Sequence, residues 1–379
     1  MYDIIIVGAG IAGIYCASIL QKTYKVLLLE SNSHAGGRIH TIESPHYEAG
    51  AARFNHRHTR LRSLIKKYRL TPIPISSTFQ YLESPQGPEY FLTTMKKLTH
   101  VKRTPHLRNI SFYDYCKEKL SSQEATLLVN IFGYRSEFVT MNAYDAIHSF
   151  QRDFLKEQYF VVQEGFSTLC DRMLVNVDIR LNTPVHTLVR EKDGFTVNDE
   201  RCKQVILTIP PTCLYRFPLL THIFPLLEGI VACPLLRIYA IYHPVWFKGM
   251  PRITTSSILR QIIPINDSGL IMISYVDGDD IQPFIRNNQL KSNKTIQRII
   301  QKELHRLFPD KTIHEPTYFS CHYWKIGAHA LLPSYPDPRP KLIQPLPGMY
   351  LCGEAYSYQQ AWIEGALETA HHVVQHIEL

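Results

Sequence analysis

A glycine-rich turn between two apolar runs at the start of the chain constrains the fold more than any other feature. The apolar run Ile4–Val7 leads directly into this turn, and a second apolar run, Val26–Leu29, ends at the acidic residue Glu30. An uninterrupted apolar run is typical of a parallel strand buried on both faces, and the interval between the two runs is long enough for a helix. The sequence therefore predicts a β-α-β unit with the glycines at its first strand-to-helix turn.

Each glycine of the turn has its own physical role. Gly8 permits the tight turn, Gly10 lets the backbone approach a pyrophosphate, and Gly13 allows the helix to pack closely against the strand. Glu30 would accept hydrogen bonds from the hydroxyls of a ribose. We therefore predict a dinucleotide site made by Gly8, Ala9, Gly10, Ile11, Ala12, Gly13, Glu30 and Ser31. The alternative is an ordinary glycine-rich turn at the start of a helix.

Composition favours a soluble globular protein rather than a membrane protein. The chain has 379 residues, of which 45% are hydrophobic and 20% charged. No run of residues reaches the length of about 18 apolar residues that a membrane span needs, and the glycine motif begins too early for a cleavable presequence. We expect a cytoplasmic protein with no membrane partner, folded as two domains or one elaborate one.

Charge and cysteine spacing argue against two further classes of function. The net charge of +8 is a mild surplus, and the densest basic run, 53–69, has the apolar spacing of an amphipathic helix, so we expect no nucleic-acid partner. The eight cysteines have no CxxC spacing, and the histidine pairs lack further ligands, so we expect neither a metal site nor a disulfide framework.

The remaining glycine segments make the chain resemble the flavin-containing amine oxidase superfamily, which includes monoamine, polyamine and L-amino-acid oxidases. The resemblance covers nearly the whole length, and its segments occur in the family's order. They are Gly8–Gly13, Glu30, Gly36–Thr41, Glu48–Phe54, Pro184-Val185, Ile206–Pro211, Tyr323-Trp324, Cys352–Ser357 and Trp362–Ala366.

The resemblance implies FAD rather than NAD as the cofactor, and the residue chemistry agrees. Gly36-Gly37 offers free backbone amides and Arg38 a planar cation, both suited to a pyrophosphate. The resemblance also implies cofactor contacts by Gly36, Gly37, Arg38, Gly50, Ala51, Ala52, Arg53, Val185, Trp324, Gly353, Glu354, Trp362, Ile363 and Ala366. Ala328 stands where monoamine oxidases carry the cysteine that tethers their flavin, so FAD is expected to be noncovalent.

For the reaction, the resemblance implies oxidation of a C–N bond. A hydride passes to flavin N5, O2 reoxidises the flavin to give H2O2, and the product is an imine. The expected catalytic residues are Arg53, Arg237, Trp324, His329 and Trp362, with His329 and Trp362 in the two places where aromatic rings commonly flank the amine. Simple packing or surface roles remain alternatives for His329 and Trp362.

Two arginines bear on the substrate. Arg53 resembles the arginine with which L-amino-acid oxidases clamp the substrate carboxylate, although a contact with FAD or a place at the start of the basic helix is an equal alternative. Arg237 replaces the lysine that usually holds a water at flavin N5, and an arginine cannot act as a base. A strand arginine facing solvent is the alternative for Arg237. Polyamines would instead require acidic pocket residues, for which Glu137, Asp145, Glu157 and Glu164 are candidates.

The predicted architecture is an α/β (α+β) fold in which a Rossmann-like FAD-binding domain of the GR2 type is interleaved with a sheet-plus-helices substrate domain. We assign residues 1–75, 155–235 and 320–379 to the FAD-binding domain and residues 76–154 and 236–319 to the substrate domain. The predicted function is that of an FAD-dependent amine or L-amino-acid oxidase. A polyamine oxidase, a flavin dehydrogenase or desaturase acting on a C–C bond, and a catalytically idle FAD-binding protein are the alternatives, and the oligomeric state stays open.

Overall fold

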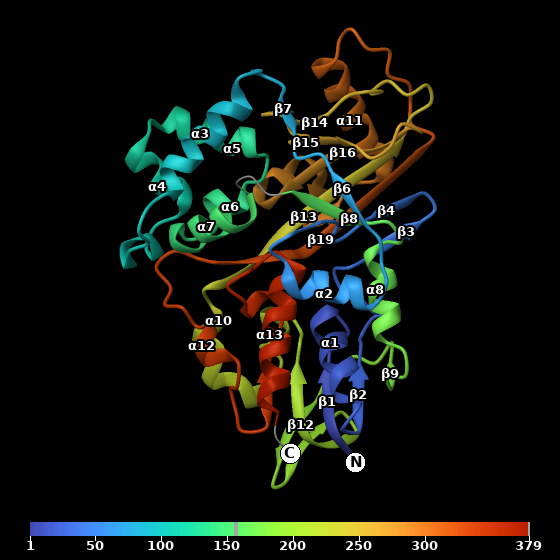
Figure 1. The fold of residues 1–379 in the computed structure, drawn as a ribbon, viewed down its shortest axis with the longest axis vertical. Helices are drawn as coiled ribbons and strands as arrows, with labels where there is room; N and C mark the ends of the chain where they lie inside the picture. Colours follow the sequence, from blue (N-terminus) through green and yellow to red (C-terminus); the bar gives the residue numbers. More distant parts are fainter. Residues whose placement is uncertain (155–157, 378–379) are drawn as a thin grey trace. The chain divides into compact units, whose positions relative to one another are not determined.

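The computed structural model describes residues 1–154 and 158–377. The chain divides into two compact units, each made of segments that are distant in sequence (Figure 1). Unit 1 contains Met1–Ile75, Glu157–Val231 and Pro336–Leu379, and unit 2 contains Ser76–Lys156 and Ala232–Tyr335. None of the described helices has an apolar stretch long enough to cross a lipid bilayer.

Unit 1 is a mixed α/β unit. Its strands are β1 (Tyr2–Val7), β2 (Val26–Leu29), β3 (Thr41–Glu43), β4 (His46–Glu48), β5 (Phe54–Asn55), β6 (Pro72–Ile75), β8 (Tyr159–Val162), β9 (Ile179–Arg180), β10 (Leu188–Glu191), β11 (Gly194–Val197), β12 (Glu200–Leu207) and β20 (Met349–Leu351). Its helices are α1 (Ile11–Leu20), α2 (Thr59–Lys67), α8 (Phe166–Met173), α9 (Pro211–Leu214), α10 (Phe224–Leu227), α12 (Arg339–Leu342) and α13 (Ile363–His376), with 3-10 turns η3 (Pro218–Ile223) and η5 (Glu354–Tyr356).

The central sheet of unit 1 is a seven-stranded sheet in the described residues, with the order β10-β11-β12-β1-β2-β9 and with β20 also paired to β12. β1 pairs in parallel with both β2 and β12, and β12 pairs in parallel with β20. The predicted β-α-β unit is therefore confirmed, with the predicted strands buried along almost their entire length. Parallel strands covered on both faces require such continuous apolar runs.

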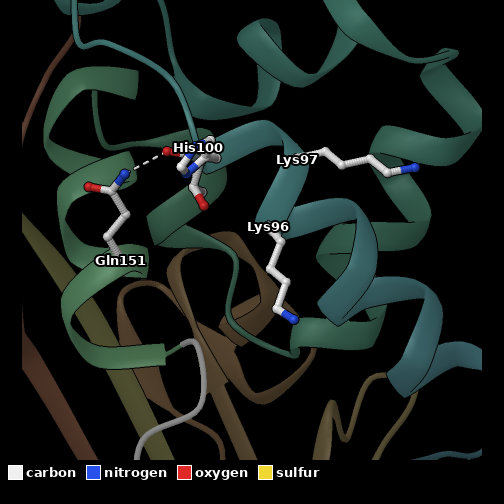
Figure 2. Close-up of a pocket in the computed structure, with 5 residues that line it drawn as sticks. Lys96, Lys97, His100 and Gln151 are labelled. Carbon is white, nitrogen blue, oxygen red and sulfur yellow. Dashed lines mark hydrogen bonds between the residues drawn. The ribbon is translucent and has the colours of Figure 1, made fainter.

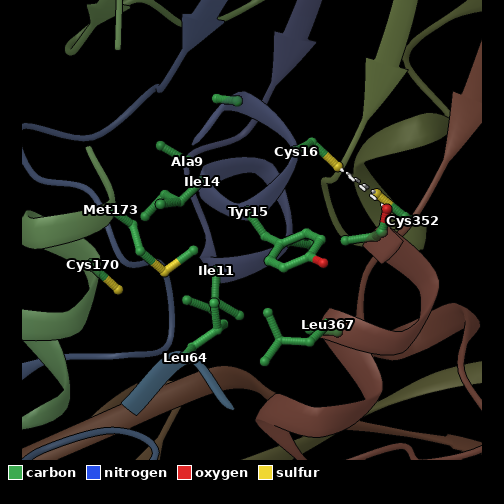
Figure 3. Packing of buried hydrophobic residues seen from close by; sticks show 14 of the residues in the cluster. Ala9, Ile11, Ile14, Tyr15, Cys16, Leu64, Cys170, Met173, Cys352 and Leu367 are labelled. Atoms are coloured by element: carbon green, nitrogen blue, oxygen red, sulfur yellow. Dashed lines mark hydrogen bonds between the residues drawn. The ribbon is translucent and has the colours of Figure 1, made fainter. Parts of the chain in front are cut away.

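Helices α1 and α13 cover this sheet, although one comes from the start of the chain and the other from its end (Figure 1). Figure 3 shows α1 packed among residues of α2, α8 and α13, with Ile14 and Leu367 both fully buried.

Cys16 of α1 and Cys352 after β20 lie with their sulfur atoms 3.9 Å apart in this core. The hydrogen bond with Cys16 and burial raise the pKa of the Cys352 thiol well above its ordinary value, so the thiol stays protonated.

Unit 2 combines helices with an extended sheet. Its helices are α3 (Gly87–Thr99), α4 (Phe112–Lys119), α5 (Ser122–Phe132), α6 (Ser136–Val139), α7 (Ala143–Ser149) and α11 (Asn293–Leu307), with short helical turns η1 (Pro105–Arg108), η2 (Phe150–Phe154) and η4 (Gly278–Phe284). Its strands are β7 (Phe79–Tyr81), β13 (Ile230–Ile241, whose first two residues belong to unit 1), β14 (Arg252–Thr254), β15 (Gln261–Pro264), β16 (Leu270–Asp277), β17 (Ile285–Arg286), β18 (Gln289–Leu290) and β19 (Tyr318–Leu331).

The main sheet of unit 2 has the strand order β19-β13-β16-β15-β14-β7. The sequence prediction places residues 232–235 and 320–335 in the FAD-binding part, whereas the structure groups them with unit 2, in which the long strand β19 pairs with β13. The helical segment 76–154 packs around its own aromatic core, in which Phe112, Phe138 and Phe150 are fully buried.

The α/β fold class predicted from the sequence is confirmed.

Candidate functional site

The glycine turn of unit 1 has the geometry that the motif predicts. Gly8 has a φ of +102°, a left-handed value that favours glycine. A Cβ on Gly13 would lie 2.0 Å from the carbonyl oxygen of Gly8, so only glycine lets α1 approach the end of β1 this closely. A Cβ on Gly10, by contrast, would meet no heavy atom of the described residues within 4 Å. Protein atoms therefore pack tightly against Gly13, whereas the space beside Gly10, where a pyrophosphate is expected, remains accessible.

Glu30 closes the turn from the end of β2. Its Oε2 accepts the backbone N–H of Ala9 at 2.7 Å, and its Oε1 accepts the backbone and side-chain N–H groups of Asn32 at 2.9 and 2.8 Å and the hydroxyl of Ser31 at 3.2 Å. Glu30 is thus a structural residue as well as the expected ribose acceptor. Oε2 accepts one of these four hydrogen bonds and Oε1 the other three, so Oε2 is the oxygen that a ligand hydroxyl would reach.

The second glycine segment lies directly against the first. The Gly36 N–H donates to the carbonyl of Ala9 at 2.7 Å, and a Cβ on Gly37 would lie 3.2 Å from the Cα of Gly10. Arg38 follows, and its Nη1 donates to Oε2 of Glu354 at 2.8 Å. Two residues that the sequence assigned to cofactor binding, more than 300 positions apart, are therefore joined by an ion pair.

The other predicted cofactor residues of unit 1 come from loops around the same turn. The Ala51 N–H donates to the Arg38 carbonyl at 2.9 Å, which fixes the segment Gly50, Ala51 and Ala52 beside Arg38. The Thr183 N–H donates to the Glu30 carbonyl at 2.7 Å, and this bond holds the loop that carries the buried Val185. These segments supply donors, a cation and open backbone, so their chemistry fits an adenine dinucleotide.

Helix α13 carries the remaining predicted residues of unit 1. Trp362 is the residue before its first turn, and Ile363 and Ala366 are buried on its inner face. The structure brings Arg53 to this end of the helix: the Arg53 Cζ lies over the Trp362 ring, 5.9 Å from the ring centroid. Arg53 and Trp362, two of the predicted catalytic residues, are thus neighbours.

Three residues that we did not predict complete this cluster. Tyr159 of β8 lies under Arg53, with its ring centroid 4.7 Å from the Arg53 Cζ. The fully buried His58 meets the Trp362 ring edge-on, with 4.8 Å between ring centroids. Glu364, 1% exposed, accepts the backbone N–H groups of Arg60 and Leu61 at 3.0 and 2.9 Å. No local motif marks these residues, because contacts between distant segments define their roles.

Glu364 links α13 to the first turn of α2, and replacing it tests that link. A buried carboxylate that accepts two N–H groups at a helix N-terminus is stabilised by charge-assisted bonds and by the helix dipole. We expect Glu364→Gln to lower the free energy of unfolding by about 1 to 2 kcal/mol in urea titrations. Glu43→Gln, whose side chain is 76% exposed, is the control and should stay within about 0.5 kcal/mol. Equal stability of the two variants would contradict a structural role for Glu364.

In unit 2, Arg237 lies buried on β13, not facing solvent. Its Nη2 donates to the Tyr275 hydroxyl at 3.2 Å, and its Cζ lies 4.5 Å from the Tyr275 ring centroid. Burial works against the charge, but interaction with the phenol groups of Tyr275 and Tyr239 outweighs it and holds the pKa of Arg237 above its ordinary value. Arg237 therefore remains a cation and cannot serve as a base.

His329 and Trp324 both lie on β19 of unit 2. His329 is 1% exposed and belongs to a regular strand, so the surface-loop alternative for this residue is wrong. Trp324 is half-buried on the same strand. An open pocket of unit 2 lies elsewhere, lined by Lys96, Lys97, Thr99, His100 and Gln151, where the Gln151 amide donates to the Thr99 carbonyl at 2.6 Å (Figure 2). Its lining contains none of the predicted site residues.

Comparisons with known proteins identify the family and the fold of the chain. Residues 6–68 match the NAD(P)-binding Rossmann-like domain, and residues 105–378 match the flavin containing amine oxidoreductase family. Structures of putrescine oxidase are similar in fold, with a TM-score of 0.79 and 18% sequence identity over 99% of this chain and 98% of that one.

Two relatives illustrate how far the sequence similarity extends. Uncharacterized protein R188 of Acanthamoeba polyphaga mimivirus is 23% identical over 98% of this chain and 93% of its own length. The L-amino acid oxidase of Cerastes cerastes is 30% identical over 99 residues, or 25% of this chain. The chain matches less than a fifth of the length of its relatives of the L-amino-acid oxidase type. The family match spans more than half of the chain, and the protein therefore belongs to the flavin containing amine oxidoreductase family.

Proposed function

We propose that this protein is an FAD-dependent oxidase whose substrate is an amine that carries a carboxylate, as L-amino acids do. The observation that carries the proposal is the position of Arg53 over the Trp362 ring, in the unit that also holds the dinucleotide turn. A guanidinium beside an aromatic wall suits a planar carboxylate attached to an apolar group. Family membership implies the flavin, and the choice of substrate is our inference.

In this proposal unit 1 binds FAD without a covalent bond. The open backbone at Gly10, the adjacent Gly36-Gly37 segment and the cation of Arg38 would hold the pyrophosphate, and Glu30 would hold a ribose. The N-terminal end of α13, at Trp362 and Ile363, would favour negative charge on the cofactor. Bound FAD would supply the hydride acceptor and the reaction with O2.

The chain's own residues then have the task of binding and orienting the substrate. Arg53 would pair with the carboxylate, which fixes the substrate carbon relative to the site. Arg237, a permanent cation beside Tyr275, would hold a water molecule or an anionic group. We propose that Trp324 and His329 of β19 contribute to the substrate wall of unit 2. A substrate amine reacts in its uncharged form, so the site must favour loss of its proton.

A peroxide assay on the purified yellow protein tests the proposal. We would compare L-amino acids with the amines that lack only the carboxylate, and include putrescine and spermidine. The expected result is peroxide from at least one L-amino acid and at least about tenfold lower kcat/KM for its decarboxylated counterpart, because that amine cannot engage Arg53. Turnover that does not depend on the carboxylate would contradict the proposal.

Other outcomes of the same assay would favour the alternatives. Peroxide from putrescine or spermidine alone would indicate a polyamine oxidase. Among the acidic candidates for that function, Asp145 is buried in α7 of unit 2, whereas Glu164 of unit 1 accepts both N–H and hydroxyl of Thr71; Glu157 lies outside the described residues. Flavin reduction without peroxide would indicate a dehydrogenase, and no reduction by any amine would indicate an idle FAD-binding protein.

A further inference from the structure

Ala361, the residue before Trp362, has a strained backbone. Its φ is +68°, in the left-handed region that is unfavourable for a residue with a Cβ. Asparagine tolerates this region through local hydrogen bonds of its side chain, which alanine cannot form. Ala361 is exposed, so packing of its methyl group in the core does not hold it there. Because such strain persists only where the surrounding structure fixes it, other contacts must hold this backbone.

Glu354 provides the contact that holds Ala361. Its Oε1 accepts the Ala361 N–H at 2.6 Å, and its Oε2 accepts Nη1 of Arg38 at 2.8 Å. Glu354 is 4% exposed, and hydrogen bonds to a carboxylate are stronger than those to a neutral acceptor. One buried side chain therefore joins the strained residue to the arginine beside the cofactor turn.

The loop before Ala361 has little room to relax. The Gln360 amide donates to the Ala355 carbonyl at 2.9 Å. A Cβ on Gly365 would lie 2.1 Å from the Gln359 carbonyl oxygen, so the loop lies directly against the first turn of α13. The strained conformation is thus fixed from the loop side as well as by the carboxylate.

The place of the Trp362 ring depends on this backbone. Trp362 immediately follows Ala361 and has extended dihedral angles, with φ −125° and ψ 148°, so a rotation at Ala361 would displace its ring. Between centroids, the ring lies 4.8 Å from His58 and 6.2 Å from Tyr159. Both ring contacts would change if the backbone of Ala361 relaxed.

We propose that Glu354 is a positioning residue, which holds Ala361 and thereby fixes the Trp362 ring beside the substrate. The inference rests on the proposed function, because that function places Trp362 next to the substrate carboxylate. The ion pair with Arg38 extends the same link to the cofactor turn. A carboxylate is required at this position, since an amide has one acceptor and one donor group and cannot accept on both sides.

Fluorine NMR of protein labelled with 5-fluorotryptophan reports the Trp362 ring directly. The chain has three tryptophans, so three resonances are expected, and Trp362→Phe assigns one of them. With saturating FAD, Glu354→Ala should shift or broaden the Trp362 resonance, while those of Trp246 and Trp324 keep their positions. The kcat/KM for L-phenylalanine should fall at least about tenfold, because misplacing a substrate-contacting group by about 1 Å can cost roughly 100-fold.

Removing the strain should remove the need for Glu354. Glycine adopts a positive φ without steric cost, so Ala361→Gly alone should keep the native Trp362 resonance. Glu354→Ala combined with Ala361→Gly should regain that resonance and most of the lost kcat/KM. The Kd for FAD should be raised in Glu354→Ala and stay raised in the double variant, because the partner of Arg38 is still missing.

Two further variants complete the experiment. If Glu354→Ala does not fold, Glu354→Gln, which has nearly the same shape but one acceptor oxygen, gives the same comparison. Asp3→Asn is the matched control, because Asp3 also accepts one backbone N–H, from Lys25, and pairs with one cation, Lys203, both at 2.9 Å. Asp3 lies at the opposite end of β1 from the glycine turn, so this variant should leave all three resonances unchanged.

The outcomes distinguish this inference from the proposed function. A native Trp362 resonance in both Glu354 variants, or a shift that Ala361→Gly does not reverse, would overturn the role of Glu354. Equal shifts of all three resonances, or the same shift in Asp3→Asn, would do so too, because they indicate a general loss of structure. If the unsubstituted protein oxidises no L-amino acid, the proposed function fails, whereas the fluorine resonances still decide whether Glu354 positions Trp362.

Discussion

The Gly10→Ala variant is expected to fold normally and to lose its flavin. Gly10 has a φ of −71°, which alanine adopts without strain, and in the part of the chain that the structure describes no atom lies within 4 Å of an added Cβ. The new methyl group would instead occupy the space where a pyrophosphate must approach the backbone. We expect the Kd for FAD to rise at least about 100-fold, because the loss of close contacts to a charged group costs about 3 kcal/mol.

Two measurements separate the loss of flavin from any loss of stability. Flavin content is measured by the visible absorbance of the purified variant, and stability is measured by thermal unfolding of the apoprotein. The apoprotein of Gly10→Ala should unfold within a few degrees of the unsubstituted apoprotein. Gly13→Ala is the control, because its effect would arise within the protein and not at the ligand. Its added Cβ would lie 2.0 Å from the Gly8 carbonyl oxygen and would disturb α1 itself. Stoichiometric FAD in purified Gly10→Ala would rule out a pyrophosphate at this turn.

The Arg53→Ala variant should lose amino-acid oxidation while retaining its flavin. Removal of a guanidinium that forms two charge-assisted hydrogen bonds to a desolvated carboxylate costs about 3 to 4 kcal/mol, or roughly 100- to 1000-fold in kcat/KM. The amine that lacks the carboxylate should lose less than about tenfold. Stopped-flow flavin reduction and peroxide production both report the change.

Two controls complete the Arg53 experiment. Arg53→Lys keeps the positive charge but not the planar fork, so we expect an intermediate loss. The visible spectrum and flavin content of both variants test the alternative that Arg53 contacts FAD. Loss of flavin in Arg53→Ala, or undiminished turnover of L-amino acids, would contradict the carboxylate contact that we propose.

The β-α-β unit and its turn could be predicted from sequence because their determinants are local. The glycine spacing, the two apolar runs and Glu30 lie within one continuous segment, and the structure has the strands and helix where the pattern predicts them. The second role of Glu30, as an acceptor for Ala9 and Asn32, is also local but was not anticipated, since the motif describes Glu30 only through its ligand.

Residues that depend on contacts between distant segments could not be predicted in the same way. Tyr159 begins a short apolar run that gives no sign of Arg53 or Trp362, and Glu364 shows its role only when α2 and α13 are adjacent. The burial of Arg237 depends on Tyr275 of the neighbouring strand β16, because β13 alone is equally compatible with a solvent-facing arginine. Periodicity shows which side chains share a face but not what covers that face.

The interleaved order of unit 1 also governs when a newly made chain can bind its cofactor. Strands β1 and β2 are synthesised well before β12, which inserts beside β1, and the Glu354 partner of Arg38 and helix α13 follow later still. Until then the apolar face of α1 lacks its cover, and pairings between remote segments form slowly. Binding of the cofactor is therefore expected only after β12 and α13 have been synthesised.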